Sequence, residues 1–443
     1  MMQKIKKTGL QFVKLFGEGK FIKVFLLTGF VTIVYSFSFF IASRAVNIPY
    51  WDQWGLADII TGKTHYNLWQ LFFYQHNEHR IGVGLLIIKL LASISHWDQL
   101  LEIKFISFLL IASAGLLVYA KYLTNKKLEF FDIFIPFLTL NIFQAENLLW
   151  GFQIPFVLPF FFLSLWLVAG LKIKPNGWRY LILTIIAFLS SYSSFHGLFL
   201  PLITIGLAFF AYFKHQQDQR VAVFASLANI LIIVTYFIGY ARNFQTSIAT
   251  NIIQIIKYFS VALSGGFWHL KIDLSNYILL AIVLTFLVVS LNRLFRGKSL
   301  TDNNAIGLAL LSFGLLFIAS LAIGRSTFGL ATSLGYRYIT FSTLVPLGLF
   351  FIFSDLKKGN LYKLILFTFI IINFFIFQGS PINWADNQRL SRQKVLDCYS
   401  VAKEKDLDQC SKIFALFPDK NFLAERIVSV LKFKKINNFK YLP

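Results

Sequence analysis

The chain has 443 residues, of which 57% are hydrophobic and only 14% charged, with 52 phenylalanines. Apolar stretches of about 18 or more residues recur along its whole length, and each can cross a hydrocarbon core of about 30 Å as a helix. This composition excludes a cytosolic enzyme, a secreted disulfide scaffold and a nucleic-acid-binding module, although the formal net charge is +22. It predicts an all-α polytopic membrane protein.

Apolar segments predict about eleven transmembrane helices. They lie near residues 24–43, 101–120, 129–143, 154–171, 180–194, 198–213, 221–240, 276–291, 304–323, 339–354 and 361–378. The segment 81–95 is apolar but short and carries Lys89, so we interpret it as an interfacial amphipathic helix. Residues 1–23 then form a cytoplasmic N-terminus, residues 24–378 a transmembrane domain with a long external loop at 44–100, and residues 379–443 a small external helical domain.

The distribution of basic residues tests this topology, because Lys and Arg concentrate in short cytoplasmic loops. The predicted inside segments hold 20 Lys and Arg, the outside loops hold 10, and the C-terminal tail holds 12. We therefore expect a multi-pass protein of a bacterial inner membrane, with its N-terminus in the cytoplasm and its C-terminus outside. The lipid bilayer is its expected surrounding, and no nucleic acid is expected as a partner.

The two cysteines, Cys398 and Cys410, both lie in the C-terminal tail. An oxidising exterior permits a disulfide between them, whereas a cytoplasmic tail would keep them reduced. Their spacing alone leaves both states open.

Polar and aromatic residues gather in the predicted external loops, and ionisable side chains near membrane depth are candidates for function. The first loop contains IPYWDQW at 48–54 and QHNEHRI at 75–81, and the next reads AENLLWGFQ at 145–153. Later loops contain SSYSSFHG at 190–197 and GRSTFGLATSLGYRYIT at 324–340. The candidate site residues in these loops are Asp52, His76, Asn77, Glu78, His79, Arg80, Glu146, Trp150, Gln153, His196, Arg325, Tyr336 and Arg337.

Several of these residues also have a purely structural explanation. Tryptophans such as Trp150 are typical interfacial anchors, and Asn77 and Glu78 suit the start of a helix. His196 is an isolated imidazole beside an apolar segment, which is more often structural than chemical. For Asp52, flanked by two tryptophans, anchoring gives no reason for a carboxylate, and we expect a functional role.

The loops favour anion binding over metal binding. A site made of His76, Glu78 and His79 fits no standard ligand spacing, so a divalent metal is possible but not indicated, and no cofactor is expected with certainty. Arg325 and Arg337 are permanently charged and bind phosphate bidentately. Snorkelling to lipid head groups is the competing explanation for both arginines.

These motifs resemble the plan of membrane glycosyltransferases of the GT-C superfold, a class that includes protein O-mannosyltransferases and aminoarabinose transferases. They also resemble a set of uncharacterised bacterial membrane proteins. Asp52 stands where the family has an acidic residue in its first external loop. The segment HNEHRI at 76–81 stands where the family has a His-containing segment, and ENLLWGFQ at 146–153 stands where it has its second external loop. The resemblance covers the layout of about the first 200 residues. The family often pairs two acidic residues in the first loop, whereas Gln53 stands in the neighbouring place here.

The resemblance implies that a sugar passes from a polyprenyl-phosphate-linked donor to a cell-envelope acceptor on the outer face of the membrane, with inversion at the anomeric carbon. Such a displacement needs a general base and stabilisation of the departing phosphate. Asp52 is the expected base, and Arg337, assisted by Arg325 or Arg80, is expected to hold the phosphate. The residues expected to bind sugar hydroxyls are Asn77, Glu78 and Glu146. A flippase or transporter of lipid-linked sugars, and a glycan polymerase, remain alternatives.

Overall fold

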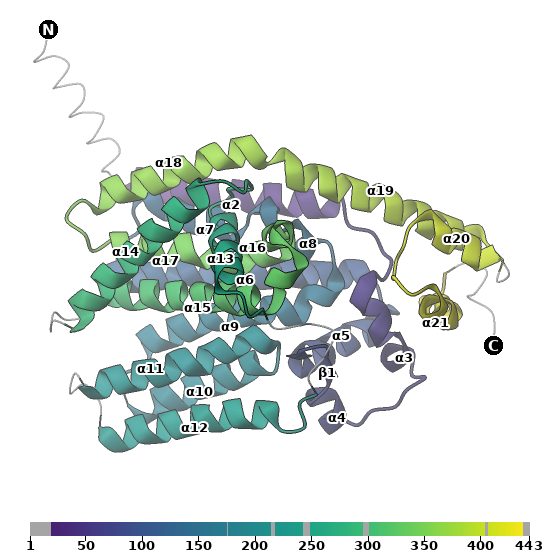
Figure 1. Cartoon of the computed structure of the whole chain (residues 1–443), viewed down its shortest axis with the longest axis horizontal. Coiled ribbons are helices and arrows are strands. Elements are labelled where there is room, and N and C mark those ends of the chain that lie inside the picture. The colour runs from purple at the N-terminus through teal and green to yellow at the C-terminus, as the bar shows by residue number, and fades with distance from the viewer. Residues whose placement is uncertain are drawn as a thin grey trace, which may run out of the picture.

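The computed structural model describes residues 19–174, 176–213, 218–241, 249–295, 301–403 and 406–436, and these are almost entirely helical (Figure 1). Nine of the described helical segments are long and apolar enough to cross a membrane. They are α2 (Gly19–Ala42), α6 (Gln99–Asn125), α9 (Ile154–Lys172), α11 (Phe199–Phe213), α12 (Gln219–Phe237), α14 (Ser275–Phe295), α15 (Asp302–Arg325), α17 (Leu344–Phe353) with the short helices before it, and α18 (Gly359–Phe377). Their length and hydropathy identify a multi-pass membrane protein.

Two of the eleven predicted spans are too short to cross a membrane as single helices, so nine segments rather than eleven meet the length requirement in the described chain. The elements in question are η2 (Phe130–Ile133), α7 (Phe134–Thr139) and η3 (Ile142–Gln144) at 129–143, and α10 (Gly177–Ser191) at 180–194. The first segment is divided because Leu140, with φ −103° and ψ 53°, leaves the helical region. The second has 15 residues, and a helix of that length rises only about 22 Å.

Ion pairs mark two ends of the helical bundle. Glu129 Oε2 lies 3.5 Å from Lys363 Nζ, near the start of α18, and we call this end of the bundle the opposite end. Glu146 Oε1 lies 3.6 Å from Arg337 Nη1, in η8, and we call this end the cavity end. The segment from Glu129 to Glu146 therefore runs from one end of the bundle to the other, although its helices are short. In Figure 1, α10 lies alongside α11 and α12 over the same length.

The long loop after α2 folds into short elements at the cavity end. They are η1 (Trp51–Leu56), α3 (Ala57–Ile60), α4 (Leu68–Phe72), an antiparallel hairpin of β1 (Gln75–His76) and β2 (His79–Arg80), and α5 (Gly82–Ser95). Asn77 makes the hairpin turn with a φ of 50°, a conformation that Asn tolerates better than most residues. The helix α5 coincides with the segment predicted as an interfacial helix, and one of its faces is buried in the protein.

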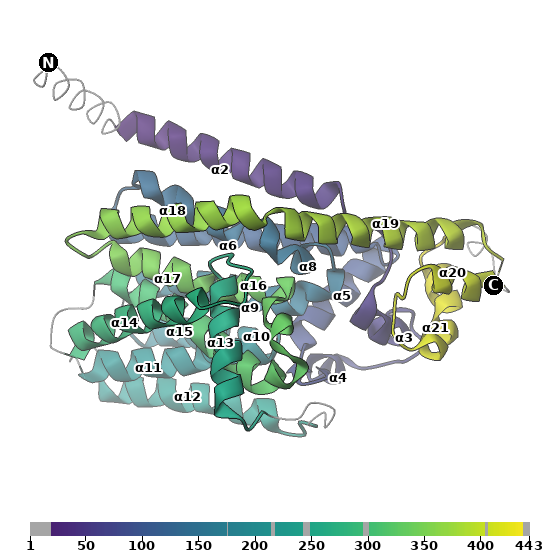
Figure 2. The same ribbon diagram turned by 45° about the horizontal axis from the view of Figure 1, so that its top comes forward.

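Further short elements join the spans at the cavity end. They are α8 (Ala145–Leu148), η4 (Gly151–Gln153), η5 (Phe195–Leu198), α13 (Ile252–Gly265), η6 (Ser326–Phe328), η7 (Leu330–Leu334), η8 (Tyr336–Tyr338) and α16 (Ile339–Ser342). Figure 2 shows that α13 runs steeply across α14 and α15 rather than along them. The chain thus places most of its irregular backbone at this end.

The C-terminal helices extend beyond the bundle and pack against the first loop. The helix α19 (Gly379–Val401) continues the direction of α18, and α20 (Leu407–Ile413) and α21 (Lys420–Phe433) fold beside it (Figures 1 and 2). A disulfide joins Cys398 to Cys410, with a Cα–Cα distance of 5.6 Å. The backbone N–H of Trp51 donates to the carbonyl of Leu416 at 2.8 Å, so these helices contact the loop that carries Asp52.

We expect Gly84→Val to destabilise the contact between α5 and α9. A Cβ at Gly84 would lie 2.7 Å from Pro155 Cα, so a side chain there must push the two helices apart. Overpacking of this kind costs about 1–3 kcal/mol, which lowers the thermal unfolding midpoint of the protein in detergent micelles. The control is Gly115→Val on α6, where a Cβ meets no atom within 4 Å. Equal midpoints for the two variants would contradict the close packing of α5 on α9.

Candidate functional site

A cavity of about 450 Å³ lies at the cavity end of the bundle. Its lining consists of Asp52, His76, Asn77, Glu78, His79, Trp150, Gln153, Phe156, Phe195, His196, Tyr240, Phe317, Ser320, Leu321, Ile323, Gly324, Arg325, Arg337, Tyr338 and Phe341. Ten of the thirteen candidate residues from the sequence are among them. The cavity therefore brings together polar residues from several loops that lie far apart in the chain.

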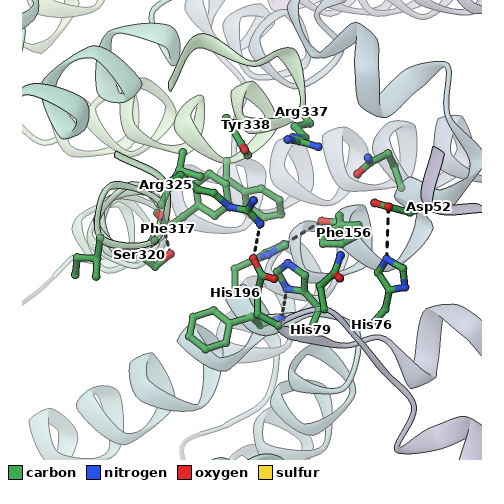
Figure 3. A pocket seen from close by; sticks show the side chains of 18 of the residues that line it. Asp52, His76, His79, Phe156, His196, Phe317, Ser320, Arg325, Arg337 and Tyr338 are labelled. Atoms are coloured by element: carbon green, nitrogen blue, oxygen red, sulfur yellow. Dashed lines mark hydrogen bonds and ion pairs between the residues drawn. The ribbon is translucent and has the colours of Figure 1, made fainter. Parts of the chain in front are cut away.

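Asp52 and His76 face each other across one side of the cavity (Figure 3). Asp52 lies in the first turn of η1, and its Oδ1 is 3.7 Å from His76 Nε2. That distance exceeds a hydrogen bond, and His76 Nε2 has no hydrogen-bond partner among the described residues. The Asp52 carboxylate and the buried His76 nitrogen thus lie side by side at one edge of the cavity.

The surroundings of Asp52 differ from the expected pair of flanking indoles. Trp54 turns into the core, where its Nε1 donates to the carbonyl of Pro49 at 3.0 Å, and Trp51 is 42% exposed. The Asp52 side chain is 30% exposed. The Asp52 carboxylate therefore lies in the cavity lining rather than between two indoles.

Two ion pairs bring arginines to the cavity. Arg325, the last residue of α15, pairs with Glu78 at the turn of the hairpin. Arg337 lies near Glu146, whose Oε2 also accepts the backbone N–H of Arg337 at 3.3 Å. Burial raises the pKa of the Glu146 carboxyl, and the Arg337 guanidinium opposes that rise. The Arg337 side chain is 41% exposed, so its guanidinium keeps donors for a ligand.

Two histidines form the inner part of the cavity and are held by backbone groups. His79 Nδ1 accepts the backbone N–H of Phe195 at 3.3 Å, and burial, with a smaller contribution from Arg325, lowers the pKa of His79 to about 3. His196 Nε2 donates to the carbonyl of Phe156 at 3.1 Å. Burial therefore keeps His79 neutral, and its hydrogen bond to Phe195 fixes the ring. The hydrogen bond to Phe156 fixes the ring of His196.

Apolar side chains continue the cavity between the helices, and the sequence reasoning missed them. Phe156 comes from α9, Phe317 and Leu321 from α15, and Phe341 from α16. Each stands in a long apolar run, where it cannot be told from a lipid-facing or core residue. One signal was available: Phe317, Leu321 and Arg325 are spaced four residues apart, which places them on one helical face.

Arg80 is not part of the cavity, contrary to its expected role beside the phosphate. Its guanidinium donates to the backbone carbonyls of Tyr236 at 2.7 Å and Phe73 at 2.5 Å, and also to that of Ile238. The residue is only 4% exposed. Arg80 therefore holds the hairpin against the end of α12, with its guanidinium buried outside the cavity lining.

Tyr336 and Glu146 are also absent from the cavity lining. The Tyr336 hydroxyl lies 2.6 Å from Ser380 Oγ, and its ring packs against Trp384 with a centroid separation of 5.6 Å. Glu146 acts on the cavity through its contact with Arg337. Tyr336 thus belongs to the contact with α19, and Glu146 is a positioning residue.

Gln53, which stands where the resembling family often has a second acid, has a structural role. Its Nε2 donates to Glu102 Oε2 at 2.7 Å, and its Oε1 accepts the backbone N–H of Tyr50 at 3.1 Å. Glu102 is fully buried and also accepts the Trp97 indole N–H at 3.0 Å. The amide therefore links η1 to the start of α6 beneath the cavity.

The described residues contain no group of three or more His, Cys, Asp or Glu side chains arranged to hold a metal ion. No protein-family model, curated protein or solved structure matches the chain.

We expect the thermal unfolding midpoint to fall as the pH is lowered from about 6.5 towards 3, and His79 to contribute to that fall. The folded pKa of His79, about 3, lies below its unfolded value of about 6.5, so the unfolded state binds more protons in this window. The stability that neutral His79 contributes is thus complete above about pH 6.5 and is lost on acidification.

The measurement compares midpoints of purified variants across this pH range. His79→Gln keeps an acceptor for the Phe195 N–H but cannot titrate, so its midpoint should fall less steeply than that of the wild type. His65→Gln, at an exposed position between α3 and α4, is the control and should keep the wild-type slope. A wild-type slope in His79→Gln would show that His79 is not held neutral.

Proposed function

We propose that the protein is a membrane glycosyltransferase that moves a sugar from a polyprenyl-phosphate donor to a cell-envelope acceptor. The observation that carries this proposal is one cavity lined by two carboxylates, three imidazoles and two guanidinium groups beside an apolar wall. A lipid-linked sugar phosphate presents the complementary series of groups, namely an apolar chain, an anionic phosphate and a polar sugar.

We propose that the chain crosses an inner membrane eleven times, with α10 and the segment 129–143 as additional passes, and that the cavity end faces outward. The excess of Lys and Arg in the segments at the opposite end supports this orientation. The Cys398–Cys410 disulfide at the cavity end agrees with it, because disulfides persist in oxidising compartments.

The donor would bind with its lipid chain against Phe156, Phe317 and Phe341 and its phosphate at Arg337. Arg337 is the stronger candidate for the main phosphate contact, because Arg325 already pairs closely with Glu78. Arginine binds phosphate oxygens through two parallel N–H donors, which fixes orientation as well as charge. The residues left to contact sugar hydroxyls are Asn77, Glu78, Trp150 and Gln153.

The chemistry would be a single inverting displacement. Asp52 takes the proton of the acceptor hydroxyl while that oxygen attacks the anomeric carbon from the side opposite the phosphate. The bond between the anomeric carbon and the phosphate oxygen breaks, and its electron pair leaves with polyprenyl phosphate, whose charge Arg337 and Arg325 stabilise. His76, 3.7 Å from Asp52, would orient the hydroxyl between the two side chains.

Asp52→Asn should abolish sugar transfer while leaving the thermal midpoint near that of the wild type. An amide cannot accept the proton, and general-base catalysis contributes about 10²–10⁴ in rate. The assay is covalent transfer of labelled sugar from defined polyprenyl-phosphate donors by purified protein in lipid vesicles. Glu425→Gln, at an exposed position on α21, is the control and should transfer normally.

Near-normal transfer by Asp52→Asn would remove Asp52 from the base role. The same vesicles separate the other functions, because movement of the labelled carrier across the bilayer without a new glycosidic bond would identify a flippase. Repeated addition of sugars to one acceptor would identify a glycan polymerase.

Arg337→Lys should raise the KM for the donor by about tenfold or more, with a smaller effect on kcat. Lysine keeps the positive charge but loses the paired donors that match a phosphate. Arg389→Lys, on the exposed surface of α19, is the matched control and should leave the donor KM unchanged. Equal donor KM values for Arg337→Lys and wild type would place the phosphate elsewhere.

A further inference from the structure

A second cavity, of about 440 Å³, lies towards the opposite end of the bundle. Its walls come mainly from α9, α11 and α15, and the last two lie side by side in Figures 1 and 2. Asp302, the first residue of α15, lines this second cavity, whereas Arg325, the last residue, lines the first. The two cavities are therefore separate sites on one helix.

The second cavity is apolar along its length and charged at one end. Leucine, isoleucine and phenylalanine side chains form most of its walls. A Cβ added at Gly170 or at Gly206, which also line it, would meet no atom within 4 Å, so both glycines leave open space. Arg179 and Asp302 supply one positive and one negative group at the charged end. In the described part of the chain, Arg179 Nε has no hydrogen-bond partner.

The depth of this cavity matches one leaflet of a bilayer. Its lining on α15 extends from Asp302 to Leu316. These residues are separated by about 21 Å along a helix that rises about 1.5 Å per residue. Half of a bilayer about 40–45 Å thick, head groups included, is about 20–22 Å. If its charged end lies at the head groups, a cavity of this depth reaches to near the middle of the membrane.

We propose that the second cavity binds one phospholipid whose head group carries both a phosphate and a primary ammonium, as in phosphatidylethanolamine. The Arg179 guanidinium binds the phosphate, and the Asp302 carboxylate binds the ammonium. One acyl chain lies along the apolar walls past Gly206. A head group with a phosphate but no ammonium leaves Asp302 unpaired beside a negative charge, so it binds more weakly. None of these residues belongs to the proposed transferase site.

The test is native mass spectrometry of the purified full chain in detergent, titrated with phosphatidylethanolamine or phosphatidylglycerol of the same acyl chains. Wild type should bind phosphatidylethanolamine about tenfold more tightly, a difference of about 1.4 kcal/mol. Gly206→Leu fills the apolar part and should weaken this binding about tenfold. Gly115→Leu, at an equally open position on α6 outside the cavity, is the control and should bind as the wild type does.

Asp302→Asn tests the head-group contact separately. It should bind the two lipids with similar affinity, because the carboxylate that selects the ammonium is gone. Equal affinities in the wild type, unchanged binding by Gly206→Leu, or a preference that persists in Asp302→Asn would each overturn the proposal. Sugar transfer is not part of the readout, so failure of this proposal and failure of the proposed function are distinguishable.

Discussion

The cost of a charged side chain in hydrocarbon sorts the ionisable groups of this protein to the two ends of its helical bundle. At the opposite end, Lys121 is fully buried, and its Nζ donates to Asn303 Oδ1 at 3.0 Å and Ser354 Oγ at 2.7 Å. At the cavity end, the pair of Glu78 and Arg325 crosses from the hairpin to α15. Because that pair joins segments from the two halves of the chain, it defines the cavity between them.

Polar groups at the cavity end differ in how completely they are satisfied, and this difference separates structural residues from candidates for chemistry. Arg80 donates to three backbone carbonyls, so its charge stabilises the fold. His76 Nε2 has no hydrogen-bond partner among the described residues. Arg337 Nη1 lies 3.6 Å from Glu146 Oε1, and the Arg337 side chain is 41% exposed. A ligand with a hydroxyl and an anionic group would supply partners for His76 and Arg337. This is the physical basis of the proposed transferase site.

Hydropathy predicts the nine long spans well, because the bilayer imposes length and composition on each helix separately. It does not predict the break at Leu140, which depends on backbone angles, and it places α10 three residues too late in the chain. Loop composition identifies ten of the twenty cavity residues, but not their pairing, since Glu78 and Arg325 are 247 positions apart. It also does not distinguish Arg80 from Arg337, because a buried arginine that binds carbonyls and one that binds phosphate look alike in a sequence.

The C-terminal helices help to support the cavity, because they hold the loop in which Asp52 lies. Trp51 has a φ of 47°, and a bulky residue in that region costs about 1–3 kcal/mol unless its surroundings hold it. The backbone N–H of Trp51 donates to the carbonyl of Leu416. Arg392 on α19 donates to the carbonyl of Leu149 at 2.9 Å, and its guanidinium lies 5.2 Å from the centroid of the Tyr50 ring. Release of these contacts would let Trp51 relax to an ordinary φ, and the relaxed loop would no longer direct the Asp52 carboxylate into the cavity.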